Sequence, residues 1–168
     1  LCEMIDAQRL HELEPHVNGI KAIHVPEAGI VDYRQVCARM AEKVESKEEN
    51  QIFLASKVVQ MSISGDRVVV STARGEHEAR FVVNCAGLHS DRVTSLTETP
   101  KAKIIPFRGE YFEVIPEAHH LCRNLIYPVP DPSFPFLGVH FTRMIEGGLE
   151  CGPNAVLAFA REGYTRTN

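Results

Sequence analysis

The chain has 168 residues, 44% of them hydrophobic and 24% charged, which is the composition of a folded, water-soluble protein. Its formal net charge of −4 at pH 7 gives no electrostatic basis for binding nucleic acid. No run approaches the roughly 18 consecutive apolar residues that a membrane-spanning helix needs. A chain of this length is sufficient to bury a substantial core.

The first third of the chain predicts two helices and one strand. Residues 6–13 place their apolar positions on one side of a short helix, and residues 20–25 have strand character. Asp32 precedes a segment with an apolar residue at every fourth position, and Gln35 follows three residues later in a capping-box arrangement. We therefore expect a helix over residues 32–48 that ends in a charged, solvated run.

After this helix the periodicity changes to two residues, which is the period of a strand. Segments 51–54, 57–64, 67–72 and 80–83 show this alternation, with turn residues between them. The simplest arrangement is a three-stranded antiparallel meander that ends in the sequence FVVNCAG.

FVVNCAG ends a run of large apolar residues with a small-residue corner, Asn84–Gly87. These side chains are too small to block a group that approaches the backbone. Ser90 or Asp91 is expected to cap the short helix that follows. Such a corner serves either tight packing or the approach of a ligand, and the residues alone favour neither interpretation.

A second β-rich part begins near residue 103. The stretches IIPFRGEYFEVIP, LIYPVP, FLGVHFT and GGLECGP have strand character, and their prolines favour edge strands and loops. The order of elements predicts an α+β (mixed α/β) fold in two parts. Helices and a β-meander occupy residues 1–100, and an antiparallel β-rich part occupies residues 101–168.

The cysteines and paired histidines give no sign of a metal site. The five cysteines are Cys2, Cys37, Cys85, Cys122 and Cys151. Their odd number and irregular spacing predict buried, reduced thiols and a cytosolic compartment. His119 and His120 are adjacent and lack a partner at ligand spacing, so we expect solvent-facing loop histidines.

Two residues of the second part are candidates for holding an acid substrate. The Arg108 guanidinium matches a carboxylate with two parallel hydrogen bonds, and the alternative is a surface arginine paired with Glu110 or Glu113. Tyr127 lies in a rigid, proline-flanked segment. It is either a ligand contact or a core tyrosine with a satisfied hydroxyl group.

His140 is a candidate proton acceptor, because imidazole titrates near neutral pH. It alternates with apolar residues 137, 139 and 141. If those residues face the core, His140 faces the other side of the sheet with Gly138 and Thr142. The alternative is an ordinary exposed strand histidine.

Six segments match a known pattern in consistent order across nearly all of the chain: GIVDYRQV (29–36), FVVNCAGLHSDRV (81–93), IIPFRGEYF (104–112), IYPVPDP (126–132), LGVHFT (137–142) and CGPNAVLAFAREGY (151–164). Together they resemble the FAD-dependent D-amino-acid-oxidase-like superfamily, and within it the branch that oxidises L-2-hydroxyglutarate. The resemblance implies that residues 1–100 are part of a Rossmann-like FAD domain and residues 101–168 part of a substrate domain.

Members of that superfamily begin with a strand–G-x-G-x-x-G–helix unit and end with a glycine-rich segment, and this sequence contains neither. The resemblance therefore implies that the chain is an internal fragment. Because the glycine loop and its helix supply the main site for the pyrophosphate, we expect the 168-residue chain alone to bind FAD weakly or not at all and to be inactive.

The resemblance also implies roles for individual residues. Val58 lies in the strand whose backbone reads the adenine. Asn84, Cys85, Ala86 and Gly87 match the corner where the backbone comes close to the dinucleotide, with Cys85 in place of the commoner alanine.

On the substrate side, Tyr111 occupies the position of a substrate-facing histidine in some relatives. His140 is then the better candidate for the catalytic base, and Arg108 and Tyr127 would hold the acid.

The implied reaction is oxidation of the 2-hydroxy acid L-2-hydroxyglutarate to 2-oxoglutarate, with hydride transfer to FAD and a quinone or O2 as the electron acceptor. The expected location is the cytoplasm, with peripheral association with the inner membrane left open. Two alternatives remain at this point: a related oxidase or dehydrogenase of amino acids or glycerol 3-phosphate, and a cofactor-free binding module.

Overall fold

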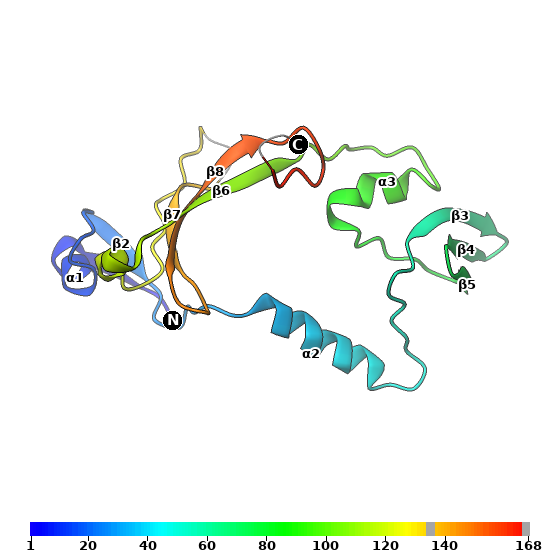
Figure 1. Ribbon diagram of the computed structural model, residues 1–168, viewed down its shortest axis with the longest axis horizontal. Coiled ribbons are helices and arrows are strands. Elements are labelled where there is room, and N and C mark those ends of the chain that lie inside the picture. The colour runs from blue at the N-terminus through cyan, green and yellow to red at the C-terminus, as the bar shows by residue number, and fades with distance from the viewer. Residues whose placement is uncertain (134–136, 166–168) are drawn as a thin grey trace. The chain divides into compact units, whose positions relative to one another are not determined.

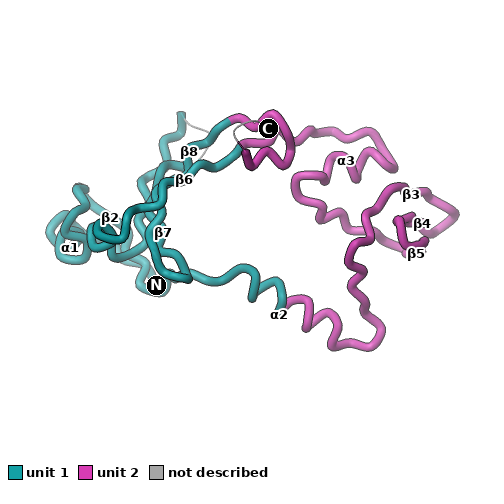
Figure 2. Tube along the Cα trace, in the orientation of Figure 1, with its two compact units in different colours: residues 1–39, 108–156 teal, residues 40–107, 157–168 magenta. Residues whose placement is uncertain are grey.

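The computed structural model describes residues 1–133 and 137–165. The chain divides into two compact units, and each unit is made of two separate pieces of sequence (Figure 2). Unit 1 comprises residues 1–39 and 108–156, and unit 2 comprises residues 40–107 and 157–168. The division of function near residue 100 stays a prediction.

Unit 1 begins with a small β-hairpin that encloses a helix (Figure 1). Strand β1 (Glu3–Asp6) pairs antiparallel with β2 (Lys21–His24), and helix α1 (Ala7–Leu13) lies between them in sequence. The Asp6 carboxylate accepts a hydrogen bond of 2.8 Å from the Arg9 backbone N–H and so caps the helix. The expected first helix and first strand are confirmed.

The rest of unit 1 is built around a three-stranded sheet in the order β6-β8-β7 (Figure 1). These strands are β6 (Phe107–Glu113), β7 (His140–Arg143) and β8 (Leu149–Leu157), and the 3-10 helix η2 (Pro116–Leu121) follows β6. Strands β7 and β8 run antiparallel, with His140 opposite Gly152. The Leu149 side chain is fully buried, so the core of this unit lies against the central strand.

A buried carboxylate fixes the end of α1 to a distant loop of the same unit. Glu14 is only 3% exposed. Its carboxylate accepts hydrogen bonds from the backbone N–H groups of Arg123 and Asn124 and from the Asn124 side-chain amide. A buried charge is tolerated when several donors surround it, and this one joins residues about 110 positions apart.

Unit 2 contains an antiparallel meander in the order β3-β4-β5. Its strands are β3 (Val58–Ser64), β4 (Arg67–Thr72) and β5 (Gly75–Ala79). The expected meander is therefore confirmed, but its third strand lies earlier than expected. Helix α2 (Tyr33–Glu45) leads from unit 1 into unit 2, and the Asp32 carboxylate accepts the Arg34 N–H as predicted for its cap.

Two expected strands are absent among the described residues. Segments 51–54 and 80–83 form no strand, and the Phe81 side chain is 86% exposed. Alternation gives a segment the capacity to be a strand, but a strand forms only where a neighbour accepts its backbone hydrogen bonds. No strand of the meander pairs with either segment, and Leu54 lies in a turn.

After the small-residue corner the chain forms a single turn of 3-10 helix, η1 (Gly87–His89), and then the short helix α3 (Ser90–Thr94). The N-cap residue is His89, without a side-chain cap, so the expectation that Ser90 or Asp91 would cap this helix is wrong. The Asp91 carboxylate instead pairs with Arg161.

All five cysteines are free. Only Cys122 is buried, and burial raises the pKa of its thiol. Cys2, Cys37 and Cys85 are exposed, which corrects the expectation of buried thiols.

Within residues 1–133 and 137–165, no three His, Cys, Asp or Glu side chains gather as metal ligands. Over the same ranges, no helix combines the length and apolar character needed to cross a bilayer.

Candidate functional site

An aromatic cluster forms on the β6-β8-β7 sheet from three residues that the sequence analysis had selected. We call Tyr111, Tyr127 and His140 the aromatic cluster. The Tyr127 ring stacks on the His140 ring, with centroids 4.5 Å apart and planes inclined by 28°. Tyr111 meets the same imidazole edge-on, at a centroid distance of 6.5 Å. Both arrangements are favourable for aromatic rings, so they fix the orientation of the imidazole.

His140 is buried, and its tautomer follows from a single contact. The side chain is 7% exposed, so the alternative of an exposed strand histidine is wrong. Its Nδ1 lies 3.0 Å from the Gly138 carbonyl oxygen. Because a carbonyl oxygen can only accept, Nδ1 carries the proton, and the neutral ring leaves Nε2 as the acceptor. In the neutral ring, this tautomer has its lone pair on Nε2, the atom that a general base would use.

The neighbours of His140 along the chain do not form a core face. Leu137 and Val139 are exposed, although the alternating pattern had placed them on the buried side. Residues 137–139 precede β7 and have no strand pairing, so the period of two does not apply to them. His140 is the first residue of β7 and lies on the sheet itself.

Two glycines make room for the aromatic cluster. Gly152 lies opposite His140, and a Cβ there would stand 2.7 Å from Tyr111 Cδ1 and 2.9 Å from the Glu110 carbonyl oxygen. A Cβ on Gly138 would stand 2.7 Å from Pro128 Cγ. The Tyr111 ring therefore lies directly over the backbone of Gly152, which no larger residue allows without a shift.

Arg108 lies apart from the aromatic cluster. Its Nη2 donates to Glu110 Oε1 at 2.6 Å, and its side chain is largely buried. Side chains alternate along a strand, so Arg108 and Glu110 share one face of β6 while Tyr111 belongs to the other. The pairing with Glu110 that composition favoured is present, and the role of Arg108 as a substrate clamp stays a prediction.

The small-residue corner of unit 2 is braced by its own asparagine. Asn84 Nδ2 donates to the Ser90 carbonyl oxygen at 2.8 Å and to Thr94 Oγ1 at 3.1 Å. Its Oδ1 accepts the Ala86 N–H at 3.1 Å, which closes an Asx turn. The asparagine side chain thus shapes the corner from within.

The accessible surface of the corner consists of backbone and small groups. Cys85 is exposed, and a Cβ on Gly87 would meet nothing within 4 Å. Gly87 has φ +53°, a conformation that favours glycine. Val58 is the first residue of β3 and pairs with Thr72. A corner with open space in front of its backbone fits the close approach of a dinucleotide.

Next to this corner, Asp91 and Arg161 form a two-pronged ion pair. Arg161 Nη1 and Nη2 lie 2.6 Å from Asp91 Oδ1 and Oδ2. The hydrogen bonds from Arg161 hold the pKa of Asp91 well below its usual range, against the opposing effect of burial, and the Ile104 and Arg92 N–H groups lower it further.

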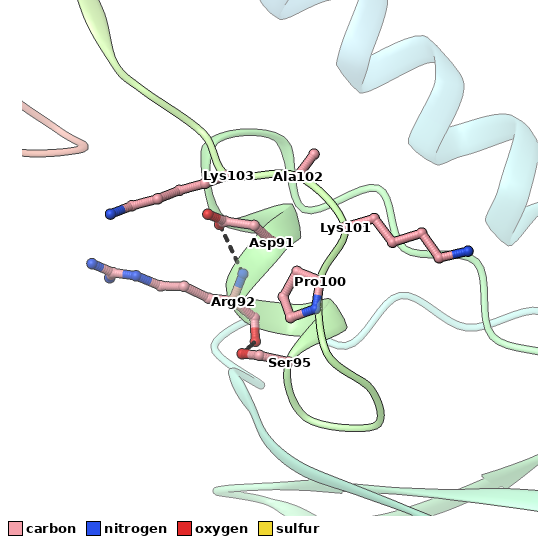
Figure 3. Close-up of a pocket in the computed structure, with 7 residues that line it drawn as sticks. All are labelled: Asp91, Arg92, Ser95, Pro100, Lys101, Ala102 and Lys103. Atoms are coloured by element: carbon pink, nitrogen blue, oxygen red, sulfur yellow. Dashed lines mark hydrogen bonds between the residues drawn. The ribbon is translucent and has the colours of Figure 1, made fainter.

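Asp91 also borders a surface hollow whose other lining residues are Arg92, Ser95, Pro100, Lys101, Ala102 and Lys103 (Figure 3). Lys101 and Lys103 extend in opposite directions (Figure 3). Arg92 extends to the same side as Lys103, and Lys101 extends to the other (Figure 3).

The family model for FAD-dependent oxidoreductases matches residues 1–167, and the chain belongs to this family. An L-2-hydroxyglutarate dehydrogenase from Indibacter alkaliphilus is 49% identical over 97% of this chain and 41% of its own length. The protein of that name from Escherichia coli (strain K12) is 46% identical over 98% of this chain and 39% of its own. A mitochondrial L-2-hydroxyglutarate dehydrogenase from Caenorhabditis elegans is 47% identical over 97% of this chain and 39% of its own. The chain thus spans about two-fifths of the length of these relatives.

Nothing in the sequence pattern identified Glu14 and Arg161 as residues that connect distant segments of the chain. Both are charged residues in segments that look solvent-exposed, and their partners lie 110 and 70 positions away. No local pattern identifies such pairs. The bracing by Asn84, by contrast, had a local signal, since asparagine two residues before a free backbone N–H commonly forms an Asx turn.

Proposed function

We propose that this chain is part of a flavoprotein oxidoreductase that converts L-2-hydroxyglutarate to 2-oxoglutarate. Membership of the FAD-dependent oxidoreductase family and the identity to three dehydrogenases of that name support the proposal. The observation that carries it is the state of His140, a buried imidazole with Nδ1 committed to a carbonyl oxygen and Nε2 left as acceptor.

His140 is proposed as the catalytic base. Its Nε2 takes the proton from the C2 hydroxyl group, and the resulting imidazolium keeps its Nδ1 bond to the Gly138 carbonyl oxygen. The chemistry that FAD would supply when bound is that of a hydride acceptor for C2. The Tyr127 ring stacked on the imidazole prevents it from rotating between the two events.

Tyr111 and Tyr127 are proposed to bind the acid. The ring of each contacts the His140 ring, and a phenol O–H donates well to a carboxylate. Arg108 is proposed as the cationic contact for the acid. Its guanidinium is paired with Glu110, so a substrate carboxylate would have to compete with that side chain.

Residues 1–100 are proposed to contact the cofactor. Residues 101–168 are proposed to contact the substrate. Val58 would contribute backbone to the adenine. Cys85, Ala86 and Gly87 would contribute backbone to the dinucleotide, with Asn84 holding them in shape.

The electron acceptor is proposed to be a quinone or O2, and the location to be the cytoplasm or the surface of the inner membrane. Turnover of the full-length protein with a soluble quinone analogue under anaerobic conditions, compared with turnover in air, separates the two acceptors. Sedimentation of the protein with membranes at low and high salt tests the location.

The base is tested in the full-length protein by His140→Ala. We expect flavin reduction in single-turnover stopped flow to slow by about 10²- to 10⁴-fold, the usual contribution of a general base, while the dissociation constant of the substrate changes little. His120→Ala is the matched control, because His120 is an exposed histidine whose Nδ1 lies 2.8 Å from the Glu117 carbonyl oxygen and whose ring meets that of His16 edge-on. Unchanged reduction would remove His140 from the role.

The substrate is tested by comparing 2-hydroxyglutarate with glycine and glycerol 3-phosphate at equal concentration. Preference for either of the last two compounds would replace the proposed activity with that of a related amino-acid or glycerol-3-phosphate enzyme. Absence of flavin from the purified full-length protein would favour the cofactor-free binding module instead.

A further inference from the structure

The segment that follows β8 folds back onto the turn next to the small-residue corner. Arg161 binds the Asp91 carboxylate with both arms of its guanidinium, at 2.6 Å each. Its Nη1 also donates to the Leu88 carbonyl oxygen. All of these residues belong to unit 2, so the contacts lie within one compact body.

The pair is more than a surface contact. The side chains of Arg161 and Asp91 are only 12% and 10% exposed. Besides the two bonds from Arg161, the Asp91 carboxylate accepts the N–H groups of Ile104 and Arg92. A shielded, bidentate pair with further hydrogen bonds has a fixed geometry, whereas an exposed pair has little effect on structure.

The Asp91–Arg161 pair lies next to the small-residue corner in the chain. Leu88, whose carbonyl oxygen Arg161 binds, directly follows Gly87, the residue with φ +53°. Asn84 braces the corner from the inner side through Ser90, and Arg161 braces the same turn through its neighbours Leu88 and Asp91. Glu162 Oε1 also lies 3.1 Å from His89 Nε2 in the same turn. Side chains therefore hold this turn at three points.

We propose that the Asp91–Arg161 pair is a positioning element for the cofactor site, which fixes the turn after Gly87 in the shape that FAD requires. The inference rests on the proposed function, because it assumes that FAD lies against this corner. Neither residue touches the cofactor in this proposal; both act through the backbone of residues 87–91.

The single and double variants separate positioning from stability. Arg161→Gln leaves the negative charge of Asp91 largely buried and unpaired, and Asp91→Asn leaves the positive charge of Arg161 in the same state. Each single variant should therefore lower the free energy of unfolding and also remove the two-pronged contact. The double variant Asp91→Asn/Arg161→Gln leaves no unpaired charge and recovers stability, but it lacks the two-pronged contact. Positioning predicts that FAD affinity stays low in the double variant.

The experiment is a titration of the apo form of the full-length protein with FAD, followed by quenching of flavin fluorescence. We expect the dissociation constant for FAD to rise about tenfold in Arg161→Gln and in the double variant. If the turn of residues 87–91 is displaced, one strong contact between its backbone and FAD is lost. Arg161→Lys keeps the positive charge but cannot form the two parallel hydrogen bonds of a guanidinium. Its dissociation constant for FAD should lie between those of these variants and the wild type. It also serves as the test if Arg161→Gln does not fold.

Hydrogen exchange of the apo protein supplies a readout independent of catalysis. The Ile104 amide, which donates to Asp91 Oδ2, and the amides of residues 84–91 should exchange faster in the double variant. The β3-β4-β5 meander should be unchanged. Arg9→Gln is the matched control, since Arg9 forms an exposed ion pair with Glu12 in unit 1, away from this turn in sequence.

The outcomes are distinct. If the wild-type protein fails to bind FAD, the proposed function itself falls. If the wild type binds FAD but Arg161→Gln, or Arg161→Lys in its place, binds it within twofold, the positioning role is overturned. It is equally overturned if the double variant recovers FAD affinity together with its melting temperature, because the pair would then act only on stability.

Discussion

In the aromatic cluster of unit 1 the functional groups are side chains, whereas in the small-residue corner of unit 2 the side chains are occupied and the backbone is left accessible. The rings of Tyr127 and His140 stack on each other and carry a phenol and an imidazole. Asn84 uses both ends of its amide on its own loop. Proton transfer needs a specific titratable atom, but a dinucleotide can be bound through backbone groups, so the two sites require different kinds of residue.

The difference predicts that substitutions act differently at the two places. A change in the aromatic cluster should alter chemistry or substrate binding and leave FAD affinity unchanged. A change in the corner should alter FAD affinity and leave the substrate dependence of the loaded protein unchanged.

The largest effect is expected for Gly152→Ala. The new Cβ would stand 2.7 Å from Tyr111 Cδ1 and 2.9 Å from a backbone oxygen, so the ring and strand must shift. We expect a loss of about 1–3 kcal/mol in the free energy of unfolding, the usual cost of overpacking, together with slower flavin reduction. Urea denaturation and stopped flow measure the two quantities. Gly29→Ala is the control, because a Cβ there meets nothing within 4 Å; equal stability of both variants would contradict the packing described.

The next effect is expected for Tyr127→Phe, which keeps the ring stacked on His140 and removes only the hydroxyl group. If that hydroxyl donates to the substrate carboxylate, KM should rise about tenfold, the equivalent of one hydrogen bond to a charged group, with kcat little changed. Steady-state kinetics with 2-hydroxyglutarate measures both. Tyr33→Phe, at an exposed position in α2, is the control. A lower kcat at constant KM would instead assign the hydroxyl to the chemical step.

A smaller effect is expected for Asn84→Ala in the corner. The substitution removes the bonds to Ser90, Thr94 and Ala86, and we expect FAD to bind about fivefold more weakly, which corresponds to about 1 kcal/mol. Fluorescence titration of the apo protein measures it. Asn50→Ala, which removes one exposed bond to the Val44 carbonyl oxygen, is the matched control. An altered KM with normal FAD affinity would contradict the expectation that the corner acts on FAD binding and the aromatic cluster on the substrate.

The smallest effect is the pH dependence of the Asp91–Arg161 pair. Folding lowers the pKa of Asp91 from its ordinary value of 3.8, so the carboxylate stabilises the folded state fully above that value. The stabilisation should be lost as the pH falls below 3.8 toward the lower pKa of the folded state. Urea unfolding of the wild type and Asp91→Asn at several pH values should therefore converge in acid.

Asp131 provides the comparison for this prediction. Its pKa is also lowered, by hydrogen bonds from the Ser133 hydroxyl and backbone N–H, and among the described residues these are its hydrogen bonds. Asp131→Asn should show the same sign with a smaller amplitude. A difference for Asp91→Asn that grows as the pH falls would contradict the assigned pKa direction.

The sequence by itself determined the elements whose signals are local. The helix capped by Asp6, the helix that begins after Asp32 and the antiparallel meander were predicted from spacing and capping residues, and all three are present. The family was also evident from ordered motifs, which the family match confirms. These features depend on residues within a few positions of one another, so a linear pattern contains the information.

The tertiary structure decided the features that depend on distant partners. Segment 80–83 has the alternation of a strand but forms none, because pairing requires a neighbour and not only a pattern. The interleaved units, the burial of Glu14 and the Asp91–Arg161 pair join residues far apart in the chain. The tautomer of His140 likewise follows from a fold-dependent contact with the Gly138 carbonyl oxygen. The sequence shows which reactive side chains the protein has. The packing of the chain determines which atoms of those side chains are already hydrogen-bonded within the protein.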